Sequence, residues 1–193
     1  MIITKQSHLT LVLPAQPTAR ELFAAQELQK YLKAIFNGIS VTIATDQTCT
    51  SGDVILIGGP QRNIKTADSI SAEAFNALVP GPEGIYIRAV SADTLICAGS
   101  HNPHDSERGT LYAVYELLER FLGCSLAAYV NPDIAGGEYL PDLQEADLTD
   151  IHYIKAAADN PYRTAIAEYH GRKVDCKKQA DFVPDHWYAF EQK

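Results

Sequence analysis

Two polar loops of this chain hold residue types that could do chemistry. The first is Gly58-Gly59-Pro60, which follows an apolar run. A glycine-rich turn after a strand can cradle phosphate when a helix follows and offers its backbone donors. Pro60 lacks a backbone N–H, and the chain holds neither G-x-G-x-x-G nor G-K-[ST]. A tight turn is therefore favoured over a nucleotide site.

The second loop runs from Gly99 to Ser106 and contains His101 and His104. Two imidazoles could bind a metal ion, but no third ligand stands near them in the sequence and H-E-x-x-H is absent. We expect a solvated connector and no metal site. The chain also lacks a G-x-S-x-G elbow.

None of the four cysteines lies in a C-x-x-C pair, which argues against a zinc ribbon or a thioredoxin motif. Cys97 lies in an apolar run and is expected in the core. The cysteines are Cys49, Cys97, Cys124 and Cys176.

Composition limits the class of protein. The 193 residues are 46% hydrophobic and 21% charged, as expected for one globular domain with an appendage. The net charge is −8, with 16 basic against 24 acidic residues, which disfavours nucleic acid as a partner. No apolar run approaches the ~20 residues of a membrane span, and the N-terminus does not resemble a signal peptide. The sequence predicts a cytoplasmic protein that binds no membrane.

One long helix begins after Pro17. Thr18 and Glu21 have the spacing of a capping box, and Asn37-Gly38 follows the last apolar position. Its apolar face would hold Leu22, Ala25, Leu28, Leu32 and Ile35.

Strands and a second long helix complete the expected fold. Ser71–Val79 should form a short helix, and Ser106–Cys124 a long one with Asp105 or Ser106 as cap and Gly123 at its end. Predicted strands are Leu9–Pro14, Ile39–Ala44, Asp53–Ile57, the hairpin of Gly84–Val90 with Thr94–Ala98, and a segment within Leu148–Ala158. We predict an α/β (α+β) fold: a mixed sheet of about five strands with two main helices on one face.

Gly109 stands near the start of the second long helix, where glycine costs roughly 0.5–1 kcal/mol against alanine. Close packing of this helix on the sheet would recover the cost, and it is favoured over direct ligand contact. The apolar stripe of the helix is Leu111, Val114, Tyr115, Leu118 and Leu122.

The sequence "RGTLYAVYELLERFLGC" after the strand end "ICAGS" resembles a small N-terminal domain of bacterial glycoside hydrolases. The α-glucuronidases and β-N-acetylhexosaminidases carry this domain, as does a related bacterial family of unknown function, which is the closest resemblance. It covers roughly residues 5 to 145. It implies an α/β accessory domain over 1–145 and a connector with the start of a truncated barrel, or a C-terminal tail, over 146–193.

In the resembled proteins a segment like "NPYRTAI" is the first strand of a catalytic barrel, and here it begins at Asn160. A (β/α) barrel needs ~250 residues. Fewer than 45 residues follow residue 150 in this 193-residue chain. The chain is thus expected to be a fragment or a short form without a catalytic barrel.

By the same analogy Glu168 and His170, with Arg172 beside them, would line a sugar pocket. Separately, the aromatic ring of Trp187 could stack on a sugar ring. Glycoside hydrolysis needs two carboxyl groups ~5–9.5 Å apart. Only one can be named here, so no catalytic residue is assigned. Packing or surface roles for Glu168 and Trp187 are favoured.

The resulting expectation is a non-catalytic domain of a carbohydrate-processing enzyme, without a cofactor, whose partner is its own barrel or a second copy of the chain. The alternative is a stand-alone module that binds a carbohydrate or another small ligand, which predicts a concave, aromatic-lined surface. A small doubly wound enzyme is disfavoured by the missing phosphate motif and nucleophile.

Overall fold

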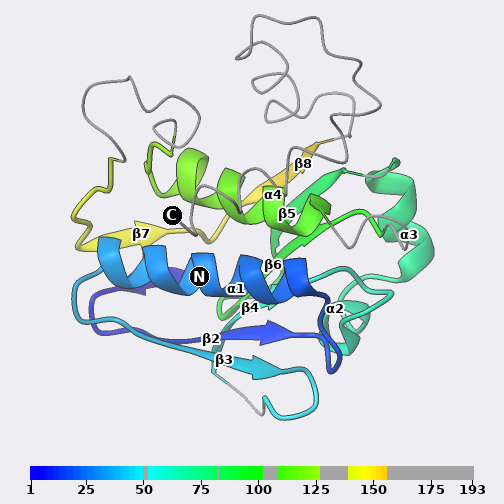
Figure 1. Cartoon of the computed structure of the whole chain (residues 1–193), viewed down its shortest axis with the longest axis horizontal. Helices are drawn as coiled ribbons and strands as arrows, with labels where there is room; N and C mark the ends of the chain where they lie inside the picture. Colours follow the sequence, from blue (N-terminus) through cyan, green and yellow to red (C-terminus); the bar gives the residue numbers. More distant parts are fainter. Residues whose placement is uncertain (50–51, 82, 102–107, 127–138, 156–193) are drawn as a thin grey trace, which may run out of the picture.

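The computed structural model describes residues 1–49, 52–81, 83–101, 108–126 and 139–155. Its main feature is a six-stranded mixed sheet with the strand order β3-β2-β4-β6-β5-β8 (Figure 1). Its strands are β2 (His8–Leu13), β3 (Ser40–Thr45), β4 (Asp53–Ile57), β5 (Ile85–Ala89), β6 (Thr94–Gly99) and β8 (His152–Lys155). Strand β5 runs antiparallel to β6 and β8, and the other pairs are parallel. The expected mixed α/β fold is confirmed, with one strand more in this sheet.

A second, smaller sheet joins distant parts of the chain. Strand β1 (Ile2–Thr4) pairs antiparallel with β7 (Glu145–Asp147), and Ile3 lies opposite Ala146. Neither three-residue strand was predicted. Strand β8 falls within the segment predicted to contain a strand, beyond residue 145, and it forms the outer edge of the main sheet beside β5.

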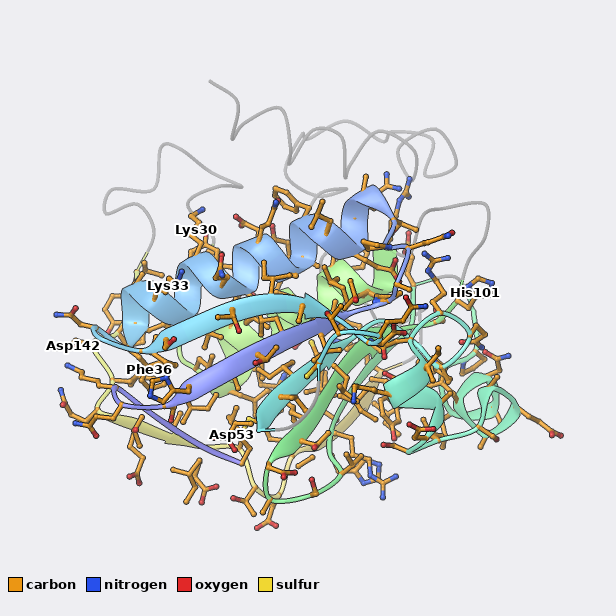
Figure 2. The ribbon with its side chains drawn as sticks, turned by 90° about the horizontal axis from the view of Figure 1, so that it is seen from below. Lys30, Lys33, Phe36, Asp53, His101 and Asp142 are labelled. Carbon is orange, nitrogen blue, oxygen red and sulfur yellow. The ribbon has the colours of Figure 1, made fainter. Side chains whose placement is uncertain are left out.

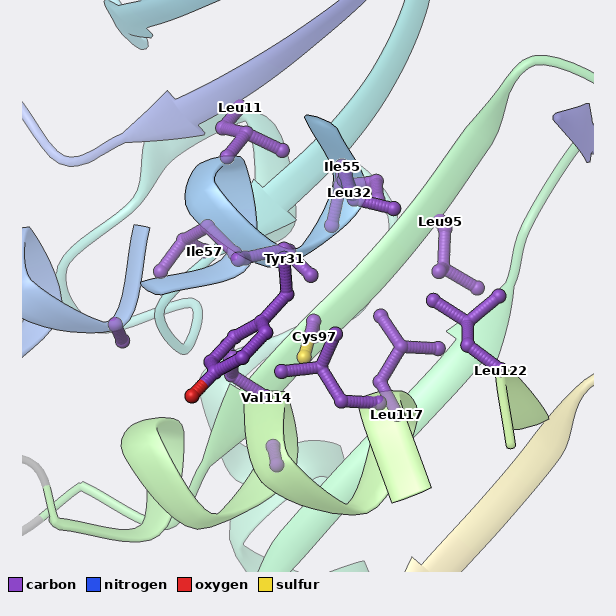
Figure 3. Packing of buried hydrophobic residues seen from close by; sticks show 14 of the residues in the cluster. Leu11, Tyr31, Leu32, Ile55, Ile57, Leu95, Cys97, Val114, Leu117 and Leu122 are labelled. Atoms are coloured by element: carbon purple, nitrogen blue, oxygen red, sulfur yellow. The ribbon is translucent and has the colours of Figure 1, made fainter. Parts of the chain in front are cut away.

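Two helices cover one face of the main sheet, as predicted. Helices α1 (Ala19–Ile35) and α4 (Arg108–Glu116) lie side by side on it (Figure 1). Figure 3 shows side chains of both helices and of the sheet in one cluster, among them Tyr31 of α1, Val114 of α4 and Cys97 of β6. This cluster is the main core. Cys97 is fully buried in it, so its predicted place in the core is confirmed.

The opposite face carries a smaller core. Phe75 and Val79 from helix α3 (Ala72–Leu78) and its C-terminus pack there against Leu56 and Tyr86. The Phe75 and Tyr86 ring centroids lie 5.2 Å apart. Because β4 has apolar neighbours on both faces, its continuous apolar run is explained. Helix α2 (Ile64–Ala67), which was not predicted, connects β4 to α3.

The capping box of α1 is present. The Thr18 hydroxyl accepts from the Glu21 backbone N–H at 3.1 Å, and the Glu21 carboxylate accepts from the Thr18 N–H at 2.7 Å. Helix α1 ends at Ile35, and Gly38 follows with a φ of 107°. The local signals therefore place this helix correctly.

The second long helix differs from the prediction in two respects. Helix α4 continues as a π-helical turn, η1 (Leu117–Phe121), before Gly123 with a φ of 72°. All nine residues of α4 are buried, whereas an amphipathic helix would bury only the face that carries its apolar stripe. The predicted caps Asp105 and Ser106 lie outside the described residues. No helix in the described part of the chain is long and apolar enough to cross a membrane.

Candidate functional site

The residues nominated from sequence for sugar binding, Glu168, His170, Arg172 and Trp187, lie outside the described residues, as do His104 and Cys176. His101 is exposed, at the opposite end of the molecule from Asp142 (Figure 2). Within the described ranges, no three His, Cys, Asp or Glu side chains are grouped so that they could hold a metal ion.

The turn after β4 is held by side-chain hydrogen bonds. Gly58 has a φ of 101°, which favours glycine. The buried Asn63 amide donates to the backbone carbonyls of Val12 at 2.9 Å and Ile57 at 3.0 Å. The Thr66 hydroxyl donates to the Gly58 carbonyl at 3.0 Å. These contacts support the tight turn that the sequence favours at Gly58-Gly59-Pro60.

Backbone packing closes the region where β6 ends and α4 begins. A Cβ atom on Gly99 would lie 2.0 Å from the carbonyl carbon of Gly109, and one on Gly109 would lie 2.6 Å from the Gly84 carbonyl oxygen. The Thr110 hydroxyl accepts from the Gly99 N–H at 3.1 Å, and the Ser100 hydroxyl accepts from the Gly84 N–H at 2.8 Å. Close packing therefore accounts for Gly109, as expected.

A depression lies elsewhere, between η1 and the segment that holds β7 and β8. Its volume is about 610 Å³. Its lining combines aromatic and cationic side chains with two carboxylates and an imidazole. The lining residues are Arg120, Phe121, Asp147, Asp150, Ile151, His152 and Tyr153. We take this depression as the candidate site of the described structure.

A buried carboxylate positions the cationic side of the depression. Glu116, at the end of α4, is 3% exposed. Its Oε2 accepts from Arg120 Nε at 3.0 Å, and its Oε1 lies 3.6 Å from Lys155 Nζ. The Glu116 carboxylate thus links the helix to β8, and it holds the Arg120 guanidinium in place through Nε.

Aromatic contacts complete this wall. The Arg120 guanidinium lies 4.8 Å from the centroid of the Tyr153 ring, as in a cation–π pair. The Phe121 ring lies 5.8 Å from the same ring at an interplanar angle of 75°. Edge-to-face geometry of this kind is favourable for aromatic pairs.

The environment sets the charges around the depression. Burial, and then the nearby Glu116 charge, raise the pKa of Tyr153, so its phenol is neutral at pH 7. The hydrogen bond to Glu116 raises the pKa of Arg120, which stays cationic. Hydrogen bonds from the Thr149 hydroxyl and backbone lower the pKa of Asp147, which stays ionised. The lining therefore offers both hydrogen-bond donors and acceptor-only carboxylates.

Sequence reasoning missed this site. The spacing of Glu116 and Arg120, four residues apart on a helix, is a signal for an ion pair. Tyr153 and Lys155 come from β8, and their approach to the helix depends on sheet pairing across many residues. No local pattern encodes that approach.

Comparison with protein-family models and with curated proteins finds no match for this chain. The resemblance to glycoside hydrolase accessory domains therefore stands on the motif residues quoted above.

Proposed function

We propose that this α/β unit is a non-catalytic accessory domain of a carbohydrate-processing enzyme and that it supports a catalytic barrel. The observation that carries the proposal is the position of β8. This strand forms the edge of the main sheet and ends at Lys155, shortly before Asn160. The segment that resembles the start of a barrel thus follows the last described strand of the sheet in the sequence.

The use of buried charge supports a structural role. Within the described ranges, four buried glutamates each lie close to a cation, and each pair joins turns or elements of the fold. The pairs are Glu21–Arg62 at 2.9 Å, Glu27–Lys30 at 3.3 Å, Glu83–Arg108 at 3.5 Å and Glu116–Arg120 at 3.0 Å. Each of these carboxylates is engaged in a contact that holds the fold together, which supports a structural role.

The test is the reading frame of the gene that encodes this chain. We expect a frame that continues past Lys193 and encodes alternating strands and helices of barrel length. The longer protein should hydrolyse aryl glycosides, and Glu83→Gln should lower its stability while leaving kcat unchanged. A stop codon directly after Lys193 would overturn the proposal.

A further inference from the structure

We propose that the depression between η1 and the β7–β8 segment binds a neutral sugar ring. The inference goes beyond a supporting role and rests on the lining residues alone. The volume of about 610 Å³ lies within the range of roughly 300–1,000 Å³ that is usual for small-molecule sites. A site of this size accommodates one or two sugar rings.

The charges of the lining disfavour an anionic ligand. Asp147 and Asp150 would repel an anion, and the positive charge of Arg120 is already paired with Glu116. Hydroxyl groups carry no charge, and each can donate to a carboxylate and accept from a guanidinium. A polyhydroxylated, uncharged molecule therefore matches the lining better than an organic acid does.

The rings supply the apolar part of the match. Phe121 and Tyr153 both line the depression. The C–H faces of a pyranose ring can pack on aromatic surface while its hydroxyl groups reach the polar lining.

The cationic wall is built before any ligand arrives. Arg120 is tied to the buried Glu116 and lies over the Tyr153 ring. A side chain that is already ordered loses little conformational entropy on binding. Arg120 and Phe121 also belong to the π-helical turn η1, and single π-helical turns occur frequently at functional sites.

The two aspartates of the lining also predict which sugars should bind more tightly. A uronic acid would bring its own carboxylate into a site that contains Asp147 and Asp150, and the repulsion should weaken binding. We therefore expect methyl β-glucopyranoside to bind more tightly than glucuronate to the same chain.

The test is calorimetric and NMR titration of the 193-residue protein with methyl glycosides of glucose, galactose, mannose and N-acetylglucosamine, and with glucuronate. We expect saturable binding of at least one neutral glycoside. Asp150→Asn should weaken it about tenfold, which corresponds to the loss of one charge-assisted hydrogen bond. Phe121→Leu, which keeps apolar volume but removes the ring, should weaken it as well.

Glu145→Gln is the matched control, because Glu145 is an exposed carboxylate on β7 that does not line the depression. It should leave the affinity unchanged. No saturable binding of any neutral glycoside would overturn the proposal, as would tighter binding of glucuronate or equal losses in Asp150→Asn and Glu145→Gln. A reading frame that stops at Lys193 would remove the supporting role without affecting these titrations, so the two proposals fail separately.

Discussion

Glycines at positions 99 and 109 allow α4 to rest directly on the end of β6. In Gly109→Ala the new methyl group would meet the Gly84 carbonyl oxygen, where a Cβ would lie at 2.6 Å. That oxygen is backbone and cannot rotate away, so helix and sheet must separate. We expect the free energy of unfolding to fall by about 2 kcal/mol, even though alanine favours the helix. Urea unfolding followed by circular dichroism measures the change.

Gly123→Ala separates this steric effect from backbone strain. Gly123 has a φ of 72°, but a Cβ there would meet no atom closer than 4.0 Å. Its expected cost is about 1 kcal/mol, the penalty for a left-handed alanine. Gly109→Ala should therefore cost more, and Gly99→Ala more still. A Gly109→Ala protein as stable as wild type would show that the sheet and helix adjust freely.

The buried thiol of Cys97 should make the free energy of unfolding depend on pH. Burial raises the pKa of its thiol in the folded protein, whereas the pKa of the unfolded thiol is about 8.5. Above that pH the unfolded state binds fewer protons than the folded state, so the free energy of unfolding falls as pH rises. The contribution of this group should be about 1.4 kcal/mol per pH unit.

Cys97→Val removes this group and should reduce the decline between pH 8.5 and 10. Below pH 7 the two proteins should show parallel dependence on pH, because the thiol is protonated in both states there. Urea unfolding at several pH values makes the comparison. Identical slopes above pH 8.5 would mean that the folded thiol ionises as readily as the unfolded one.

Among the elements, helix α2 is linked to strands β2 and β4 through the Asn63 side chain. Asn63 caps α2 through its Oδ1, which accepts from Lys65 N–H at 3.1 Å, while its Nδ2 donates to carbonyls of β2 and β4. Asn63→Asp keeps the shape and the cap but loses both donors, and it places a carboxylate against two carbonyl oxygens. We expect a loss of roughly 3 kcal/mol in the free energy of unfolding.

Asn76→Asp is the control for that substitution. Asn76 is exposed, and its Oδ1 accepts from Gln61 Nε2 at 2.7 Å, an interaction that a carboxylate retains. Its effect should stay within about 0.5 kcal/mol. Equal effects of the two substitutions would mean that the Asn63 hydrogen bonds to the two strands contribute nothing to stability.

The elements that could be predicted from sequence carry local signals. Helix α1 has a capping box and a long apolar face, and β5 and β6 are joined by a short polar turn. Strands β1 and β7 have three residues each and meet only through pairing of distant segments. The π-helical turn and the depression are also products of tertiary packing, because η1 meets β8 only in the folded sheet. This is why the aromatic and acidic lining was not found from sequence.

At the scale of the whole molecule, alternate residues of the central strands pack into two cores. Leu11, Ile55 and Cys97 face α1 and α4, whereas Val12, Leu56 and Ile96 face the α3 side. The edge strand β8 pairs with β5 and so satisfies the backbone hydrogen-bonding groups of β5 on that side. Leu148 and Ile151, in the segment that leads to β8, are themselves buried in the main core.

The extent of the cooperative unit follows from these contacts. A chain of residues 1–155 retains both cores and every described strand, so it should unfold cooperatively in urea with a midpoint close to that of the full chain. A chain of residues 1–147 lacks Leu148, Ile151 and β8, and it leaves β5 with unpaired backbone groups at a sheet edge. It should lose several kcal/mol, because each of the two buried apolar side chains contributes about 2–5 kcal/mol, and it should aggregate through the exposed edge. Size-exclusion chromatography and urea unfolding of the three chains test this.

If 1–155 were much less stable than the full chain, the core would have to extend past Lys155. If 1–147 matched 1–155, β8 would be an attachment to the sheet and would not belong to its cooperative unit.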